Sequence, residues 1–231
     1  MNVFIYYGND LNKSSGSNIF VNKLINSAKK FVKDGKVYLR HGGDMKLEYI
    51  SNWKDVMNFD TKLDKQQIAN EIYDSNIIIL ISPVFIHNVS SFMKIFLDNF
   101  AVWTHIAPLV GKVGLPISIS STNGNVFVNN YLTKIMNYWG LVTCEPVSLE
   151  LGLMTEDALD SYIRQIIQTM EEIDTGGINF DTTQVEYFFD YILKTMLTYQ
   201  KNHPEKILFD QLPYSNCQTF REAFEMMRER Y

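Results

Sequence analysis

Three segments of the chain could bind a ligand, and each follows an apolar run that is typical of a buried strand. They are residues 8–18 (GNDLNKSSGSN), residues 83–88 (PVFIHN) and residues 120–125 (SSTNGN). In an open parallel α/β sheet, ligands bind just beyond the carboxyl ends of the strands. The sequence therefore predicts that any chemistry takes place at these three segments.

The first segment has the composition of an anion site. It places small hydroxyl side chains and Gly16 at the predicted start of a helix, where unpaired N–H groups and the helix dipole favour negative charge. It matches neither G-x-G-x-x-G nor the Walker pattern G-x-x-x-x-G-K-[ST], so it is not a dinucleotide or nucleoside-triphosphate fingerprint. A capped loop without a ligand is the alternative interpretation.

The second and third segments could contact the remainder of a ligand. The second offers an apolar wall and then two polar side chains: Pro83, Val84, Phe85, Ile86, His87 and Asn88. In the third, Asn123 and Gly124 permit positive φ and a close approach of the backbone to a ligand. The alternatives are a plain strand–helix connector for the third segment and a surface or capping role for His87. We expect His87 to contact the ligand and not to act as an acid or base.

Other reactive residue types give no catalytic pattern. The two cysteines, Cys144 and Cys217, lie far apart in sequence, so neither a disulfide framework nor a C-x-x-C metal or redox motif is present. Lys94 and Asp98 lie four residues apart on a predicted helix, as in a surface ion pair. No Ser-His-Asp or paired-carboxylate arrangement stands out. We therefore predict no catalytic side chain and no metal ligands.

Five strand–helix units position the three segments. The predicted strands are residues 2–7, 36–40, 77–82, 112–120 and 141–149. The predicted helices are residues 18–34, 64–74, 90–103, 126–139 and 155–174. Strands that alternate with helices through short connections imply right-handed crossovers and a parallel sheet. Residues 41–60 interrupt this pattern. We expect them to be irregular and long enough to contain one short helix.

The third strand is the most informative of the five. Five of its first six residues, IIILIS, are Ile or Leu without alternation, which is typical of a strand covered on both faces. Pro83 is expected to end this strand, and Asn88 or Ser90 to cap the helix that follows.

Residues 178–231 do not belong to this repeating pattern. They contain two predicted helices with apolar faces, residues 183–199 and 219–230, and 11 of these 54 residues are Phe or Tyr. So much aromatic surface must be buried. The sequence thus predicts a domain of residues 1–175 and a helical extension of residues 178–231, which packs on that domain or on a partner subunit.

The segment that ends the third strand also carries a family resemblance. It resembles the S-P-x-[YF]-x-x-x-[VMI]-S…K…D pattern of the NAD(P)H-dependent FMN reductases and related flavoproteins. The matching residues are Ser82, Pro83, Phe85, Val89, Ser90, Lys94 and Asp98. The resemblance extends through about residue 174, because the strands and helices follow one another in the same order as in that family. It implies an α/β fold, a flavodoxin-like three-layer sandwich whose five-stranded parallel sheet has the order 2-1-3-4-5, here with C-terminal helices added.

The resemblance also implies FMN as cofactor and suggests its contacts. The family pattern G-S-x-R-x-x-S-x-[ST], which holds the FMN phosphate, falls here on Ser15, Ser17 and Asn18, with Lys13 near the basic position. The second segment would lie against the isoalloxazine ring, and the third against its pyrimidine edge or the ribityl chain. The implied cofactor contacts are Ser15, Ser17, Asn18, Pro83, Val84, Phe85, Ile86, His87, Asn88, Ser121, Thr122, Asn123 and Gly124.

The function that the resemblance implies is an FMN-dependent oxidoreductase. NAD(P)H would give a hydride to flavin N5, and the flavin would pass it to a small acceptor such as a quinone, a flavin, a nitro or azo compound, or an unsaturated biosynthetic intermediate. Two alternatives stay open, a flavodoxin-type electron carrier and a flavin-free interaction subunit. Because such flavoproteins commonly dimerise, a homodimer or higher homo-oligomer is expected.

Bulk properties narrow the class of protein. The 231 residues carry a net charge of −5 and no long basic run, which argues against nucleic acid as the main partner. No run of 18 apolar residues occurs, so no transmembrane helix and no membrane partner are expected. The N-terminus begins as a strand without a basic region and apolar core, so no signal peptide is expected. Together with the two isolated cysteines, these features predict a cytoplasmic protein.

Overall fold

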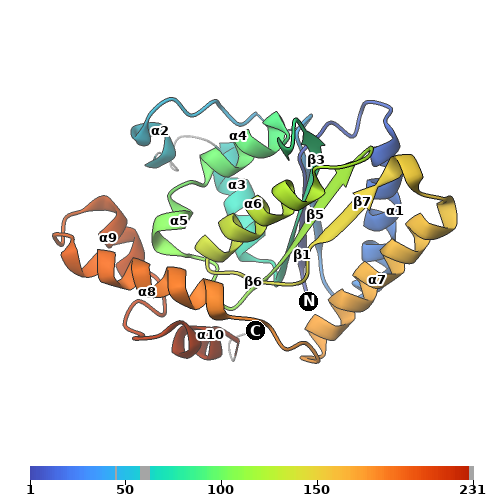
Figure 1. The fold of residues 1–231 in the computed structure, drawn as a ribbon. Coiled ribbons are helices and arrows are strands. Elements are labelled where there is room, and N and C mark those ends of the chain that lie inside the picture. Colours follow the sequence, from blue (N-terminus) through green and yellow to red (C-terminus); the bar gives the residue numbers. More distant parts are fainter. Residues whose placement is uncertain (45, 58–62, 229–231) are drawn as a thin grey trace.

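A parallel sheet lies at the centre of the molecule, between two layers of helices (Figure 1). The structure, a computed structural model, describes residues 1–44, 46–57 and 63–228. The long strands are β1 (Val3–Tyr7), β2 (Val37–His41), β3 (Ile77–Phe85) and β5 (Val113–Ser120). The order along the sheet is β2-β1-β3-β5-β6, with the short strand β6 (Val142–Thr143) at one edge. The predicted order 2-1-3-4-5 is confirmed.

The described residues form seven strands where the sequence predicts five. The predicted strand 141–149 is divided into β6 and β7 (Val147–Glu150), and both pair in parallel with β5. The break contains Pro146, which has no N–H to donate to a neighbouring strand. The other additional strand, β4 (Asn88–Val89), pairs antiparallel with the end of β3.

The register of the sheet brings the carboxyl ends of three strands to the same edge. Tyr7, the last residue of β1, pairs with Ile81 of β3, and Ser82 of β3 pairs with Ser118 of β5. The segments that leave β1, β3 and β5 therefore start next to one another, as the sequence predicts.

α1 (Gly16–Phe31) and α7 (Glu156–Asp174) cover one face of the sheet, and the other described helices before residue 175 lie mainly on the opposite face (Figure 1). The helices of this part are α1 (Gly16–Phe31), α2 (Trp53–Met57), α3 (Leu63–Tyr73), α4 (Ser91–Asn99), α5 (Trp103–Ile106), α6 (Asn125–Tyr138) and α7 (Glu156–Asp174). On the first face, Lys23 of α1 lies 3.0 Å from Glu156 and 2.8 Å from Asp160 of α7. The two helices are thus joined by ion pairs beside the sheet.

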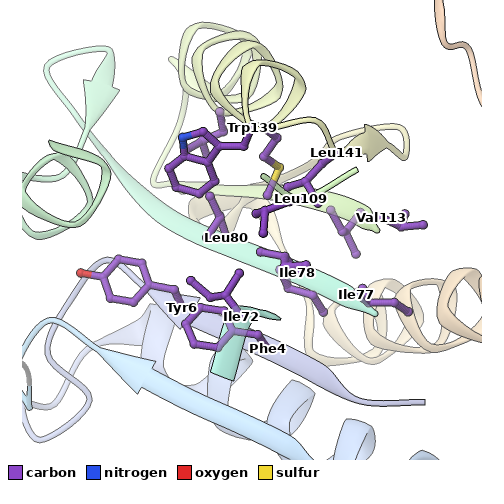
Figure 2. Close-up of a cluster of buried hydrophobic side chains, with 14 of the residues drawn as sticks. Phe4, Tyr6, Ile72, Ile77, Ile78, Leu80, Leu109, Val113, Trp139 and Leu141 are labelled. Carbon is purple, nitrogen blue, oxygen red and sulfur yellow. The ribbon is translucent and has the colours of Figure 1, made fainter. Parts of the chain in front are cut away.

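The opposite face is packed through aromatic and aliphatic side chains. The ring of Tyr6 in β1 stacks on Phe96 of α4 at 4.0 Å. Figure 2 shows Leu80 of β3 near Trp139 and Leu109 in this core. β3 is buried on both faces, as its unbroken Ile and Leu run predicts.

The predicted helix over residues 90–103 is wrong in its extent, because α4 ends at Asn99 and the short α5 follows. The buried amide of Asn99 donates hydrogen bonds to the carbonyl groups of Ile95 in its own helix and of Glu48 outside it, both at 2.9 Å. Asparagine side chains that bond to the backbone in this way compete with helical hydrogen bonds. The chain therefore turns at this point before α5 begins.

The described residues after 178 form three helices, where the sequence predicts two. They are α8 (Thr183–Thr198), α9 (Pro204–Asp210) and α10 (Phe220–Arg228), and the last residues of the predicted helix 219–230 lie outside the described ones. Aromatic side chains of this part pack on the preceding part of the chain. Phe188 of α8 stacks on Tyr138 of α6 at 3.8 Å, and the hydroxyl of Tyr214, between α9 and α10, donates to the Ala107 carbonyl at 2.6 Å. The division of the chain at residues 175 and 178 stays a prediction. Of the helices that the structure describes, none is both long enough and apolar enough to cross a bilayer.

One buried charge in this fold leads to a prediction about stability. Lys112, immediately before β5, is buried, and its Nζ donates to the carbonyl groups of Tyr73 and Ser75 at 2.8 and 2.7 Å, where α3 ends. Burial lowers the pKa of Lys112 to about 8. Because the ordinary lysine pKa is 10.5, the unfolded chain binds more protons than the folded one between these two values, so stability rises with pH in this window.

Relative to a Lys112→Gln variant, the free energy of unfolding of the wild type should therefore increase by about 3 kcal/mol between about pH 8 and 10.5. Urea unfolding of both proteins at several pH values across this window measures the difference. Because the other titrating groups are common to both proteins, they cancel. A difference that stays constant with pH would contradict the prediction.

Candidate functional site

The loop after β1 is organised by one buried side chain. The Asn18 amide donates to the carbonyl groups of Asp10 (3.1 Å), Leu11 (3.4 Å) and Lys13, and so holds residues 10–13 in a curve around the start of α1. Ser15 is the N-cap of α1, and its Oγ accepts a hydrogen bond from the Asn18 N–H. The structure thus uses the Asn18 side chain to shape the loop.

The hydroxyl groups of this loop form a connected cluster at the helix start. Ser17 Oγ lies 3.0 Å from Ser15 Oγ and 2.7 Å from the Tyr7 hydroxyl, which itself donates to Asn18 Oδ1 at 2.9 Å. The first N–H groups of a helix have no partner within the helix. Ser15 and Ser17 therefore lie beside backbone N–H groups that could bind an anion.

The sequence analysis missed the role of His41, the last residue of β2. This side chain is only 5% exposed, and its Nδ1 accepts hydrogen bonds from the N–H groups of Leu11 (3.4 Å) and Gly43 (3.2 Å). Its Nε2 lies 2.6 Å from a carboxylate oxygen of Asp44. His41 therefore joins the loop after β1 to the turn after β2. Its position at a strand end next to Gly42-Gly43 is the only sequence signal for this role.

Two serines connect the loop after β1 to the segment after β3. Ser90 is the N-cap of α4: its Oγ accepts from the Met93 N–H at 3.1 Å and donates to the carbonyl of Gly8. Ser82 Oγ accepts from the Ser90 N–H at 3.1 Å. A Cβ atom on Gly8 would lie 2.8 Å from Ser90 Oγ and from Met93 Cβ, so only glycine fits there. Of the two predicted caps, Ser90 is the residue that caps α4.

The segment 83–88 is a β-hairpin, which corrects the prediction that Pro83 ends the strand. β3 continues through Pro83 to Phe85, and Phe85 pairs with Asn88 of β4. Pro83 is tolerated because it lies where the pairing of β3 with β5 ends, at Ile119.

The tip of this hairpin has an unusual backbone. Ile86 and His87, its two central residues, have φ values of +50° and +57°. Such two-residue turns need positive φ at both positions and favour Asn-Gly, whereas a β-branched residue is strained there. The Ile86 side chain is 100% exposed and so gains no packing in return.

Replacing Ile86 with asparagine should therefore stabilise the protein by about 1 kcal/mol. The matched control is Leu197→Asn, which removes another highly exposed apolar side chain, but from a residue of α8. That change should destabilise the protein slightly, because asparagine has the lower helix propensity. Urea unfolding measures both effects, and a loss of stability in Ile86→Asn would contradict the strain argument.

The loop after β5 contacts the hairpin directly. His87 Nε2 lies 3.1 Å from Asn123 Oδ1, and the His87 ring stacks on Phe127 of α6 at 5.3 Å. Gly124 has a φ of +90°, and a Cβ atom on it would lie 2.8 Å from Val84 Cγ1. The second and third segments therefore form one continuous surface at the edge of the sheet, as the sequence predicts.

A fourth loop, which the sequence analysis did not single out, completes this edge. It contains the short 3₁₀ helix η1 (Leu151–Leu153) between β7 and α7. The Gly152 N–H donates to the Ser121 carbonyl at 3.0 Å, and a Cβ atom on Gly16 would lie 3.8 Å from Leu151 Cδ1. This loop therefore joins the segment after β5 to the start of α1.

The edge combines an exposed apolar surface with buried polar atoms that lack a partner among the described residues. Phe85, Ile86, Val126 and Phe127 expose more than half of their surface beside the hairpin and the start of α6. Ser120 Oγ, at the end of β5, is buried and has no hydrogen-bond partner among the described residues. A ligand with a planar apolar part and an anionic end matches these features.

Among the described residues, neither a metal-binding group nor an ionised thiol is found. They contain no group of three or more His, Cys, Asp or Glu side chains arranged to hold a metal ion. Burial raises the pKa of Cys144 to about 12 and also raises the pKa of Cys217, so both thiols are protonated at neutral pH.

Sequence comparison identifies relatives of known type. A sequence model of the NADPH-dependent FMN reductase family matches residues 11–153, which is more than half of the chain. An iron-sulfur flavoprotein of Archaeoglobus fulgidus is 31% identical over 90 residues, which are 38% of this chain and 40% of that protein. The chain thus matches less than half of the length of this curated relative.

Structural comparison finds proteins of similar fold. An apo NADH:FMN oxidoreductase matches 73% of this chain and 87% of its own with a TM-score of 0.55 and 16% identity. An FMN-dependent NADH-azoreductase of Bacillus anthracis in complex with FMN matches 75% of this chain and 99% of its own, with a TM-score of 0.54 and 14% identity. These likenesses confirm the predicted flavodoxin-like α/β class.

Proposed function

Because the chain belongs to the NADPH-dependent FMN reductase family, we propose that it binds FMN at the carboxyl edge of its sheet and transfers electrons from NADPH or NADH to a small acceptor. The observation that supports this most directly is the convergence of three segments at that edge. The capped start of α1, the hairpin of residues 83–88 and the loop at Gly124 adjoin one another there.

The residues at this edge fit FMN. Ser15, Ser17 and the N–H groups at the start of α1 would hold the phosphate, with Asn18 shaping the loop around it. Residues 83–88 would lie against the isoalloxazine ring, and residues 121–124 against its pyrimidine edge or the ribityl chain. The buried Ser120 Oγ, which has no hydrogen-bond partner among the described residues, supports this assignment.

Bound FMN would supply the redox chemistry, because its N5 atom takes a hydride from a nicotinamide nucleotide and passes it to an acceptor. The protein would hold the phosphate at the helix start, cover one face of the ring with the hairpin, and keep water away with Phe85 and Phe127. No acid or base side chain is needed to take up the hydride, which accords with the absence of a catalytic pattern in the sequence. The acceptor would be a quinone, a flavin, a nitro or azo compound, or an unsaturated intermediate.

We further propose that the chain forms a homodimer or a higher homo-oligomer in the cytoplasm. The exposed apolar side chains beside the hairpin are the surface that a second copy would cover. Residues 178–231 would act as a helical extension of the domain of residues 1–175, and the extension would influence the choice of acceptor or the assembly.

The function is tested by mixing FMN-loaded protein with NADPH and, separately, with NADH in the absence of oxygen. The proposal predicts rapid loss of the visible flavin band with at least one nucleotide, and its return when a quinone or azo compound is added. A protein that holds FMN but is reduced by neither nucleotide would be an electron carrier. A protein that binds no FMN would be an interaction subunit. Either result would overturn the proposed activity.

A further inference from the structure

Tyr7, the last residue of β1, joins the sheet to the loop that precedes α1. Its side chain is fully buried. The hydroxyl group donates to Asn18 Oδ1 at 2.9 Å, lies 2.7 Å from Ser17 Oγ and accepts a hydrogen bond from Asn9 Nδ2 at 3.3 Å. One hydroxyl group is therefore connected to both ends of residues 8–18, the segment that has the composition of an anion site.

The directions of the hydrogen bonds in this cluster follow from the number of protons. A hydroxyl group carries one proton, and Tyr7 gives its proton to Asn18 Oδ1. Ser15 also donates to Asn18 Oδ1, at 2.8 Å. The contacts of Ser17 Oγ with the hydroxyl groups of Tyr7 (2.7 Å) and Ser15 (3.0 Å) therefore both need the proton of Ser17. In this arrangement Ser17 donates into the cluster.

A phosphate at the start of α1 needs the Ser17 proton in another direction. Ser17 is partly exposed and lies in the first turn of α1, so its hydroxyl group can rotate toward an anion at this helix start. Its oxygen would then accept the proton of Tyr7, which turns from Asn18 Oδ1 to the shorter of its two contacts. Asn18 Oδ1 keeps the proton of Ser15, so no buried acceptor loses its last donor.

The rotation would produce a chain of donors that ends on the phosphate. Asn9 donates to Tyr7, Tyr7 would donate to Ser17, and Ser17 would donate to a phosphate oxygen. Hydrogen bonds that follow one another in this way polarise each other, so a hydroxyl group that accepts a hydrogen bond becomes the stronger donor. The hydroxyl group of Tyr7 would therefore strengthen a contact that Tyr7 itself does not make.

We propose that Tyr7 is a positioning residue for the phosphate of FMN, which acts through Ser17 and makes the site select phosphorylated flavins over riboflavin. This inference rests on the FMN site proposed above and adds to it a residue that does not touch the ligand.

The test compares the affinities for FMN and riboflavin, measured by the quenching of flavin fluorescence during titration of the FMN-free full chain. The wild type should bind FMN about a hundred-fold more tightly than riboflavin, because charge-assisted hydrogen bonds hold the phosphate. Tyr7→Phe keeps the buried ring and removes the hydroxyl group. It should weaken FMN binding by about ten-fold and leave riboflavin binding unchanged.

Tyr6→Phe is the matched control. Tyr6 is the preceding residue of β1 and is equally buried, but its side chain lies on the opposite face of the sheet (Figure 2), where its hydroxyl group donates to the Phe92 carbonyl at 2.9 Å. The variant therefore shows what the loss of a buried tyrosine hydroxyl group does by itself. Its ratio of FMN to riboflavin affinity should equal that of the wild type.

Ser17→Ala and the double variant show whether Tyr7 acts through Ser17. Ser17→Ala should weaken FMN binding by about ten-fold or more and leave riboflavin unchanged. In this background Tyr7→Phe should weaken FMN by less than about two-fold further, because the hydroxyl group that it orients is already gone. A general structural effect of Tyr7→Phe would instead add in full. Ser17→Ala also keeps the proposal testable if Tyr7→Phe does not fold.

Three results would overturn the inference and leave the FMN site in place: an unchanged affinity ratio in Tyr7→Phe or Ser17→Ala, an equal fall of the ratio in Tyr6→Phe, or a further ten-fold loss in the double variant. A wild type that binds FMN no more tightly than riboflavin would overturn the inference together with the phosphate contact at α1. A wild type that binds no FMN would overturn both the inference and the proposed function.

Discussion

Replacing Ser15 with aspartate should weaken FMN binding by about a hundred-fold or more and leave the protein folded. Ser15 caps α1, and aspartate caps helices as well as serine does, so the helix start should be preserved. The new carboxylate would lie where the proposed site holds the FMN phosphate. Two like charges about 4 Å apart near a protein surface repel by about 4 kcal/mol. This repulsion exceeds the free energy that corresponds to a hundred-fold change in affinity. Quenching of flavin fluorescence during titration of the apoprotein measures the change.

Riboflavin and a second cap variant are the controls for this result. Riboflavin has no phosphate, so its affinity should be the same for the wild type and Ser15→Asp. Thr219→Asp makes a similar change at the start of α10, where Thr219 Oγ1 accepts from the Glu222 N–H at 3.2 Å, and should not affect FMN. If Ser15→Asp bound FMN as tightly as the wild type, the phosphate would not lie at the start of α1.

Replacing Ser90 with valine should lower the free energy of unfolding by about 4 kcal/mol. Ser90 is fully buried, and its Oγ both accepts from the Met93 N–H and donates to the Gly8 carbonyl. Valine has a similar shape and no hydrogen-bonding group. The change therefore removes the cap of α4 and leaves two backbone groups without partners, each at a cost of about 1–3 kcal/mol.

The neighbouring Ser91 provides the control for Ser90. Ser91 is exposed and is the first residue of α4, so Ser91→Val should change stability by about 0.5 kcal/mol or less. Urea unfolding measures both variants. If Ser90→Val were as stable as Ser91→Val, the connection between the loops after β1 and β3 would contribute little to the fold.

The order of the sheet and the convergence of the three loops could be predicted because both follow from strong local patterns. The Ile and Leu run of residues 77–81 marks a strand buried on both faces, and parallel strands place their carboxyl ends at one edge. Gly140 has a φ of +88° and ends α6, as a glycine after a helix predicts. The helix starts at Ser15 and Ser90 follow the same kind of local rule.

The features that the sequence did not reveal depend on contacts between distant residues. The turn at Ile86-His87 lacks the Asn-Gly signature of such hairpins, because its strained backbone is held by contacts with Asn123, Gly124 and Phe127. α9 has only seven residues, too few for a clear helical period. The role of His41 depends on hydrogen bonds that it accepts from the loop after the neighbouring strand β1 and from the turn after its own strand. The position of the loop containing Gly152 likewise depends on a hydrogen bond to the Ser121 carbonyl, about 30 residues earlier in the chain.

The most direct test of the central claim is the visible absorption spectrum of the purified protein after incubation with FMN and removal of free cofactor. The account predicts a yellow protein that retains about one FMN per chain, identified by chromatography of the released chromophore. A colourless protein that retains no FMN would contradict the claim that this sheet edge is a flavin site.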